Sequence, residues 1–326
     1  MLAPPLSKRY PLVGTAFDYL LRFYLQRLNP TTVCRNGWVA ENAVACLADS
    51  PTLYKKGEEI IERAKRNVTA FLKTGQINDE LIRSALLLGG LDPILRAGVG
   101  RKNIGSVHKE DIQDLRKLIT IVDPRLFKAR KTCLLNPTFG EASFLVGGAD
   151  ADVVIEDTLI DIKTTKFPEC KPEYFHQLIG YYALHQIGSI REKKPKLNIN
   201  KVAIYFSRFA YLHSFEIKEI IDPSTFPKFL KWFEKRARKE RGPGFDKMLK
   251  ARKDRIDRNS SSDLKKHTLE RITDTKGFSH YYKKWSNTTG ETLSYSINYD
   301  KYTLIGSGGP SSISKAKALR WLKTNI

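Results

Sequence analysis

The stretch GGADADVVIEDTLIDIKTT, residues 147–165, decides the fold because it sets charged side chains among β-branched residues. Valine, isoleucine and threonine favour strands, so most of this stretch should lie in a sheet. The charged residues concerned are Asp150, Asp152, Asp161 and Lys163. Burying a charge is costly unless the charge is paired or coordinates a metal ion. The stretch therefore predicts a cluster of paired charges inside a sheet.

We expect residues 143–155 and 158–165 to form the two strands of a β-hairpin. The simplest connection is a two-residue turn at Glu156 and Asp157. A turn shifted by one residue, to Asp157 and Thr158, changes the pairing but keeps the same side chains on the same face. A three-residue loop does not, and Glu-Asp is not a favoured pair for a tight turn. The register is therefore a prediction that depends on the turn.

The first of these turns places Asp152 directly opposite Asp161, and Asp150 directly opposite Lys163. Directly opposed side chains point to the same side of a sheet, with their Cβ atoms roughly 5 Å apart. All four charges then converge on one patch. From geometry alone, the alternative is an exposed sheet face with solvated charges and an Asp–Lys surface pair.

Two facing carboxylates repel each other, and a raised pKa or a bound cation relieves the repulsion. Mg²⁺ takes one or two protein carboxylates and fills its remaining positions with water and phosphate oxygens. A neighbouring lysine supplies a positive charge to a phosphate oxygen or orients an attacking water. The hairpin thus favours a metal site that binds phosphate groups.

Outside the hairpin, apolar residues recur mostly at helical spacing before it and at both spacings after it. We expect helices over residues 15–29, with Thr15 as N-cap, and over 37–49, 53–75, 79–97, 109–120 and 172–188. Two further strands are expected over residues 201–209 and 211–217. From residue 37 the order is therefore helix, strand, strand, helix, strand, strand, which is an α/β core behind an N-terminal helical extension.

The last third of the chain is basic and rich in tyrosine. A long helix is expected over residues 224–258, broken near 241–244. Two short strands and a final helix with Ser314 as N-cap are expected after it. Basic side chains suit contacts with a phosphate backbone, and tyrosines suit stacking on bases, although tyrosines at strand spacing also pack small sheets.

The whole chain of 326 residues has 56 Lys and Arg against 35 Asp and Glu, a formal net charge of +21. A charge of this sign and size favours a polyanion as partner, and nucleic acid fits better than a membrane because no basic amphipathic anchor is present. Solubility alone is the alternative explanation. No apolar run is long enough to span a bilayer and the N-terminus lacks the order of a signal peptide, so we expect a cytoplasmic, intracellular protein.

One further pattern carries a resemblance. The hairpin with D-x-K, followed by a helix with Q-L-x-x-Y-x-x-L, resembles the PD-(D/E)XK nuclease superfamily. It is most similar to the branch of the RecB nuclease domain and the CRISPR-adaptation nucleases. Asp152 matches the first metal-binding aspartate, with Asp150 as the alternative, and Asp161 and Lys163 match the second acid and the lysine. In the helix, the glutamine and the tyrosine of the family are matched by Gln177 and Tyr181.

The resemblance implies a restriction-endonuclease-like fold, in which helices flank a mixed central sheet. The nuclease core would cover about 37–217, within a first domain of 1–222 that includes the helical extension. Residues 223–326 would form a basic helical and small α+β region that binds nucleic acid. The specific motifs cover only 148–184.

The same resemblance implies a metal site for Mg²⁺ or Mn²⁺. Its ligands would be Asp152, Asp161, the carbonyl of Ile162 and an upstream acid, for which Glu41 stands in a suitable place. Two features of the family are absent: alanine replaces the proline that names it, and the cysteines that hold an iron–sulfur cluster in some relatives are missing. No cluster is therefore expected.

The implied function is metal-dependent hydrolysis of phosphodiester bonds in DNA, in a setting such as DNA repair or defence. Two alternatives stay open: a nucleic-acid-binding module on a nuclease-like scaffold without cleavage, and a nuclease that acts on RNA. No helicase or ATPase motif is present, so a motor would be a separate partner chain.

Overall fold

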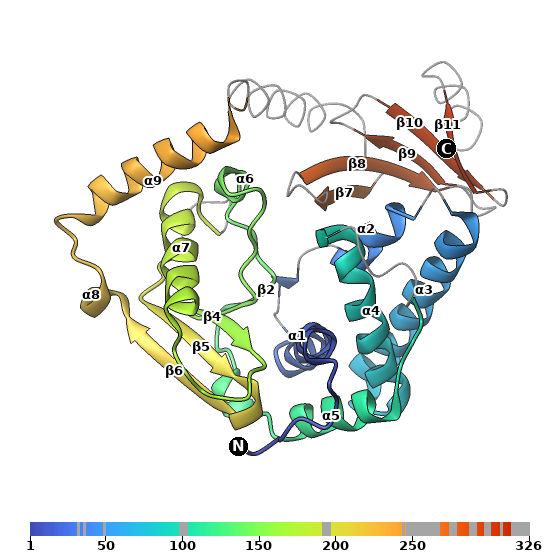
Figure 1. Cartoon of the computed structure of the whole chain (residues 1–326), viewed down its shortest axis with the longest axis horizontal. Helices are drawn as coiled ribbons and strands as arrows, with labels where there is room; N and C mark the ends of the chain where they lie inside the picture. The colour runs from blue at the N-terminus through green and yellow to red at the C-terminus, as the bar shows by residue number, and fades with distance from the viewer. Residues whose placement is uncertain are drawn as a thin grey trace.

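The predicted hairpin forms the centre of a six-stranded mixed sheet in the computed structural model of the chain (Figure 1). Its strands are β3 (Val153–Ile155) and β4 (Thr158–Lys163), and Val153 lies opposite Ile160. This is the register that a two-residue turn at Glu156 and Asp157 predicts, so that prediction is confirmed.

Neighbouring backbone holds this unfavoured turn in place. Glu156 adopts a φ of 52°, a left-handed conformation that a glutamate rarely takes. Its carboxylate accepts a hydrogen bond of 2.8 Å from the backbone N–H of Lys131, and the carbonyl of Asp157 accepts one of 2.9 Å from Asn200. Tertiary contacts therefore compensate for the absence of Asn-Gly at the turn.

The structure describes residues 1–30, 33–34, 37–47, 50–97, 104–190, 197–242 and 245, and the backbone of the strands between 268 and 313. The first sheet has the order β1-β2-β3-β4-β5-β6. Its other strands are β1 (Val33–Cys34), β2 (Cys133–Leu135), β5 (Lys201–Phe206) and β6 (Tyr211–Glu216). Strand β4 runs parallel to β5, and α7 (Pro172–Gly188) makes the crossover between them.

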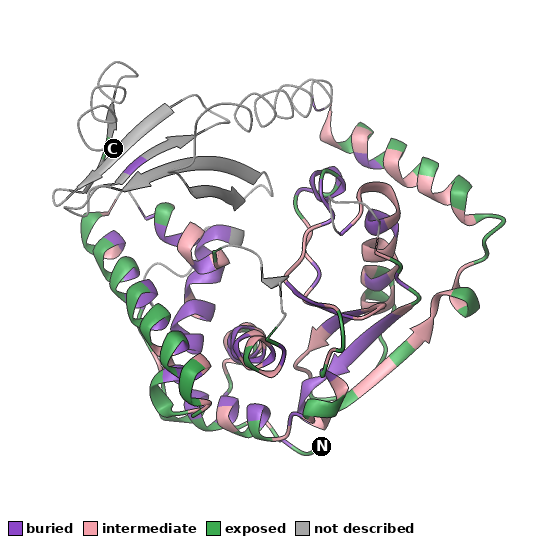
Figure 2. Ribbon diagram, turned by 180° about the vertical axis from the view of Figure 1, so that it is seen from behind, coloured by how far each residue is buried: buried purple, intermediate pink, exposed green. Residues whose placement is uncertain are grey.

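Helices cover both faces of this sheet, and the alternation of side chains along the strands shows which face is which. Val153 and Ile160 belong to the core shared with the N-terminal helices, whereas Val154 and Leu159 belong to the core shared with α7. The N-terminal helices are α1 (Tyr10–Leu28), α2 (Val39–Ala45), α3 (Pro51–Thr74), α4 (Asp79–Ala97) and α5 (Lys109–Thr120). On the α7 side lie α6 (Ala142–Leu145) and α9 (Phe226–Arg241). Figure 2 shows how far these helices are buried, with α1 largely enclosed and α9 exposed along one side.

Most predicted helices are confirmed, but α1 begins earlier than expected. It starts at Tyr10 with Pro11 in its first turn, where a missing N–H costs nothing. Thr15 is therefore not an N-cap: it lies in the second turn, and its hydroxyl donates to the carbonyl of Pro11 at 3.1 Å.

The prediction of a strand over residues 143–155 is wrong for most of its length. Residues 142–145 form the short helix α6, and Gly147 and Gly148 then take φ values of 86° and 116°. Glycine adopts these conformations readily, so the chain turns there and pairs in β3 only from Val153. On its other side, β3 pairs with β2. This strand was not predicted, because three residues are too few to show the alternation of apolar and polar side chains that is typical of a strand.

The C-terminal third differs from the prediction in its strands. Helix α9 ends at Arg241, and Gly242 follows it with a φ of 81°; of the rest of the predicted long helix, only Phe245 is described. Five antiparallel strands then form a second sheet, where two were expected: β7 (Thr268–Thr273), β8 (Ser279–Ser286), β9 (Thr292–Ser296), β10 (Lys301–Gly306) and β11 (Gly309–Ile313). The predicted last helix from Ser314 lies outside the described residues.

Three short helical segments complete the described part: η2 (Pro124–Leu126), η3 (Ser207–Phe209) and α8 (Ile217–Ile220). None of the helices in the described residues has both the length and the apolar character that crossing a bilayer requires.

Candidate active site

Asp152, Asp161 and Lys163 meet where β3 begins and β4 ends. Asp152 directly precedes β3, and its Oδ2 accepts a hydrogen bond of 2.8 Å from the backbone N–H of Ile162. Lys163 Nζ lies 2.7 Å from Asp161 Oδ2 in an ion pair, and the Asp161 side chain is only 2% exposed. The structure thus brings the predicted trio together on the α7 face of the sheet, with Asp161 buried and with Asp152 and Lys163 half-buried rather than on a solvated surface.

Helix α7 adds a chain of hydrogen bonds to this trio. Lys163 Nζ donates to Gln177 Oε1 at 2.8 Å, and Gln177 Nε2 donates to the hydroxyl oxygen of Tyr181 at 2.7 Å. Tyr174, one turn earlier, places its ring centroid 4.9 Å from Lys163 Nζ. Residues three and four apart share a helix face, which explains why the sequence spacing identified Gln177 and Tyr181. Because Tyr181 accepts from Gln177, its own proton is available to another acceptor.

The site opens into a cavity of about 480 Å³, whose wall includes Asp152, Asp161, Lys163, Gln177 and Tyr181. Helices α1 and α2 close the cavity opposite α7, through Gly14, Thr15, Val39 and Asn42. The acidic residues on its wall are Asp18, Asp92, Asp150, Asp152 and Asp161.

Asp18 is the site residue that sequence reasoning missed. It lies on α1, its Oδ2 pairs with Arg22 at 2.6 Å, and its Oδ1 is buried without a hydrogen-bond partner. An aspartate and an arginine four residues apart in an otherwise apolar helix were the available signal. A helix that begins at Thr15 would use Asp18 in its capping box, and this simpler role concealed its place on the cavity wall.

The carboxylates act on one another electrostatically. Burial raises the pKa of Asp152 well above its ordinary value, and the charges of Asp161 and Asp18 raise it further. Burial also raises the pKa of Asp161, although the ion pair with Lys163 opposes that rise. Burial and the same two β-hairpin aspartates raise the pKa of Tyr181, so its hydroxyl stays protonated and remains a donor. The site therefore holds more negative charge than its cations balance.

Glu41 does not belong to this site. Its carboxylate accepts a hydrogen bond of 2.9 Å from the backbone N–H of Trp38 and lies 3.1 Å from Lys65 Nζ. It is not among the residues that line the cavity, whereas Asn42, the next residue of α2, is. Glu41 stabilises the N-terminus of α2 instead, and the structure places Asp18 where an upstream acid was expected.

Asp150 lies on the cavity wall, but not opposite Lys163 as predicted. Because β3 begins only at Val153, Asp150 forms an isolated antiparallel bridge with Thr138. Asp152 is the aspartate held against β4, which favours it over Asp150 as the partner of Asp161.

The donor set fits a hard divalent cation that keeps water ligands. Among the described residues, no group of three or more His, Cys, Asp and Glu side chains is close enough to hold a metal by itself. Mg²⁺ needs only one or two carboxylates, and Asp152 and Asp161 would supply them. The N–H of Ile162 points toward Asp152, and N–H and C=O of one strand residue lie on the same side, so the Ile162 carbonyl faces Asp152 as well. The buried, unpartnered Oδ1 of Asp18 is a further oxygen on this wall.

No family model, curated protein or solved structure matches this chain. The function must therefore be inferred from the site itself.

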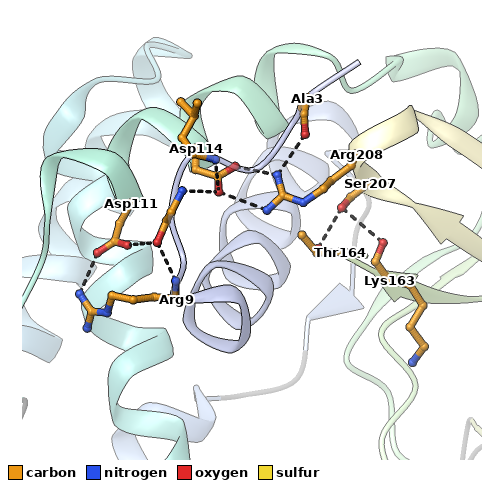
Figure 3. Close-up of polar contacts among 10 residues, drawn as sticks. Ala3, Arg9, Asp111, Asp114, Lys163, Thr164, Ser207 and Arg208 are labelled. Atoms are coloured by element: carbon orange, nitrogen blue, oxygen red, sulfur yellow. Dashed lines mark hydrogen bonds and ion pairs between the residues drawn. The ribbon is translucent and has the colours of Figure 1, made fainter. Parts of the chain in front are cut away.

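A buried polar network holds the end of β4 that carries Lys163 (Figure 3). Ser207, in η3, donates to the hydroxyl of Thr164 at 2.9 Å and lies 3.4 Å from the carbonyl of Lys163. The next residue, Arg208, pairs with Asp114 of α5 at 2.7 Å, with side chains 1% and 0% exposed. The network thus joins the sheet to the N-terminal helices directly behind the site.

The N-terminal segment is part of the same network. Arg208 donates to the carbonyl of Ala3 at 3.0 Å, and Asp114 Oδ2 accepts from the backbone N–H of Leu6 and Ser7 at 3.2 Å each. These contacts supply the partners that a buried ion pair needs to be tolerated.

Proposed function

We propose that this protein is a metal-dependent nuclease that hydrolyses phosphodiester bonds in DNA. The proposal rests on one observation above all: in the register that the turn at Glu156 and Asp157 sets, Asp152, Asp161 and Lys163 line one polar cavity. A cation between the two aspartates would relieve their repulsion, and Lys163 would be positioned to act on a bound phosphate.

The architecture is consistent with a restriction-endonuclease-like fold, which we propose on the same grounds. The mixed sheet carries the paired acids where β3 begins and β4 ends, and α7 crosses to the parallel strand β5. In this proposal 1–222 form the catalytic domain and 223–326 the region that grips nucleic acid.

A divalent cation, Mg²⁺ or Mn²⁺, would supply positive charge to the scissile phosphate and lower the pKa of the attacking water. Asp152 and Asp161 would hold it, with the Ile162 carbonyl and Asp18 as further oxygen donors. Lys163 would stabilise charge that develops on the phosphate, and Gln177 holds the lysine amine in place through the 2.8 Å hydrogen bond. The hydroxyl of Tyr181 would donate to a phosphate oxygen.

The charge of the chain supports a nucleic acid as substrate. The net charge of +21 should attract the phosphate backbone of a nucleic acid to the protein, and this attraction should weaken as the salt concentration rises. Helix α9 carries seven basic residues, of which Arg236 and Arg238 pair with glutamates of the same helix: Lys228, Lys231, Lys235, Arg236, Arg238, Lys239 and Arg241. A helicase or another nucleic-acid-processing chain remains a proposed separate partner.

The direct test is cleavage of linear, circular and single-stranded DNA with Mg²⁺ or Mn²⁺, beside the variants Asp161→Ala and Lys163→Ala. We expect the wild type to cleave and both variants to lose at least ~100-fold in rate, because each loses charge stabilisation in the transition state. Equal rates in all three proteins would contradict the assignment. Binding without cleavage by the wild type would favour a nucleic-acid-binding module without activity. A matched RNA substrate tests whether the protein is a nuclease that acts on RNA.

A matched pair of variants tests which upstream acid takes part. Asp18→Asn should lower the cleavage rate ~10- to 100-fold, because it removes a negative charge beside the aspartate pair and replaces one of the two carboxylate oxygens with an NH₂ group, which cannot bind a cation. Glu41→Gln should cleave within about twofold of the wild type, because Glu41 contacts Trp38 and Lys65 outside the cavity. If Glu41→Gln instead cleaved much more slowly than Asp18→Asn in the same assay, Glu41 and not Asp18 would be the acid that takes part.

A further inference from the structure

Two exposed aromatic side chains stand beside the cavity, and the proposed chemistry does not use either of them. Phe167 is 63% exposed and lies four residues after Lys163, in the loop between β4 and α7. Tyr10, the first residue of α1, is 43% exposed. Large aromatic side chains that are this exposed to solvent need an explanation when they lie near a candidate functional site.

The two aromatics belong to one rim that is continuous with the cavity. Tyr10, Gly14 and Asp18 are spaced four apart on α1, so they share a helix face, and both Gly14 and Asp18 line the cavity. A Cβ on Gly14 would lie 3.8 Å from Thr164 Cβ, so α1 and the loop touch there. Tyr10 is eight residues from Asp18, about 12 Å along the helix axis.

The loop residues are ordered so that Phe167 stays at the surface. Thr165 Oγ1 donates to the carbonyl of Phe167 at 2.8 Å, which fixes the backbone at that residue. Lys166 Nζ lies 5.3 Å from the centroid of the Tyr10 ring, so the loop that carries Phe167 also places a cation against Tyr10.

The charges around this rim suit phosphate. Among the ion pairs of the described residues, none involves Lys166, and two further lysines close to the aromatics in the chain, Lys8 and Lys171, are exposed. Exposed aromatic rings together with cations match a nucleic-acid strand, whose bases stack and whose phosphates carry the charge. A duplex keeps its base faces covered, so only unpaired bases can use such a surface.

We propose that Tyr10, Lys166 and Phe167 form a stacking platform for unpaired bases next to the scissile phosphate, so that the preferred substrate is single-stranded at this point. The proposal rests on the proposed nuclease function and adds the strand state of its substrate. Stacking also tolerates any base, so the platform predicts little sequence preference.

The test measures binding rather than cleavage, in buffer with EDTA, by fluorescence anisotropy of labelled oligonucleotides. The probes are a single-stranded DNA, the same strand with a run of abasic sites, and a blunt duplex. The proteins are the wild type, Phe167→Ala, Phe167→Leu and Phe167→Trp, with Lys166→Met as a matched control for charge. Phe167 is exposed, so thermal unfolding should show the same midpoint for all its variants.

We expect Phe167→Ala and Phe167→Leu to bind the single strand ~10-fold more weakly, while Phe167→Trp retains wild-type affinity because it can still stack. The abasic strand should bind all Phe167 variants equally, and Lys166→Met should weaken both strands by the same factor. Equal affinity of wild type and Phe167→Ala for the single strand, or tighter binding of the blunt duplex by the wild type, would overturn the platform. Cleavage is not needed for any of these readings, so an inactive protein that shows this pattern would refute only the nuclease proposal.

Discussion

Replacing Asp152 with asparagine is expected to abolish metal-dependent cleavage and to make the metal-free protein more stable. The two effects have one cause. Asparagine keeps the shape of the side chain and still accepts the hydrogen bond from Ile162 N–H, but it removes a buried negative charge beside Asp161 and Asp18. The cleavage rate should fall at least ~100-fold, because a cation would lose one of its two carboxylates.

The gain in stability has a pH dependence whose sign follows from the raised pKa of Asp152. Burial and the neighbouring carboxylates raise this pKa in the folded state above that of the unfolded chain. The unfavourable contribution is absent below the unfolded pKa, where both states are protonated, and grows as pH rises through the folded pKa. A one-unit rise in pKa corresponds to ~1.4 kcal/mol, so near neutral pH the variant should be more stable by ~1 kcal/mol or more.

Thermal unfolding with EDTA at several pH values measures this directly. The difference in Tm between Asp152→Asn and the wild type should be near zero at pH about 4, the ordinary pKa of aspartate, and increase toward neutral pH. Added Mg²⁺ should stabilise the wild type and not the variant. As a control, Glu59→Gln removes an exposed carboxylate on α3 and should show neither effect. A variant that melts below the wild type at neutral pH would contradict the electrostatic account.

The second large effect is expected from Arg208→Met, which should destabilise the fold by ~3–5 kcal/mol. The substitution leaves the buried carboxylate of Asp114 without its cation, and the carbonyl of Ala3 without its donor. Desolvation of an unpaired charge accounts for most of this cost.

Arg9→Met is the matched control, because Arg9 also pairs with an aspartate of α5 but is 31% exposed. It should cost less, ~1–2 kcal/mol, because the buried carboxylate of Asp111 keeps its hydrogen bonds from the Ser7 hydroxyl and the His108 N–H. The double variant Arg208→Met with Asp114→Leu should recover part of the loss in urea unfolding, because no charge is then left buried. Equal losses for Arg208→Met and Arg9→Met would show that the network does not hold the sheet to the N-terminal helices.

The parts of the site that lie close together in the chain could be predicted from the sequence. A two-residue turn at Glu156 and Asp157 determines which residues of β3 and β4 face each other, so the position of Asp152 near Asp161 could be predicted on the condition of that turn. Helical spacing predicts Gln177 and Tyr181 on one face of α7 in the same way, and their hydrogen bond confirms it.

The parts that depend on distant packing could not be predicted. Asp18 reaches the cavity only because α1 lies across from the start of β3, which no local pattern encodes. Glu41 was the plausible acid by position, but a glutamate in the first turn of a helix also stabilises that end, and here it does so. The short strands β1 and β2 were missed because their pairing, not their composition, defines them.

The most direct test of the account is a calorimetric titration of Mn²⁺ into the wild type, Asp161→Asn and Lys163→Met. The central claim predicts a Mn²⁺ site in the wild type that releases protons on binding, that is lost in Asp161→Asn, and that persists in Lys163→Met. Proton release follows from the raised pKa of Asp152 and Asp161, and persistence from the removal of a cation that competes for Asp161. Unchanged Mn²⁺ binding in Asp161→Asn, or no such site in the wild type, would contradict the claim.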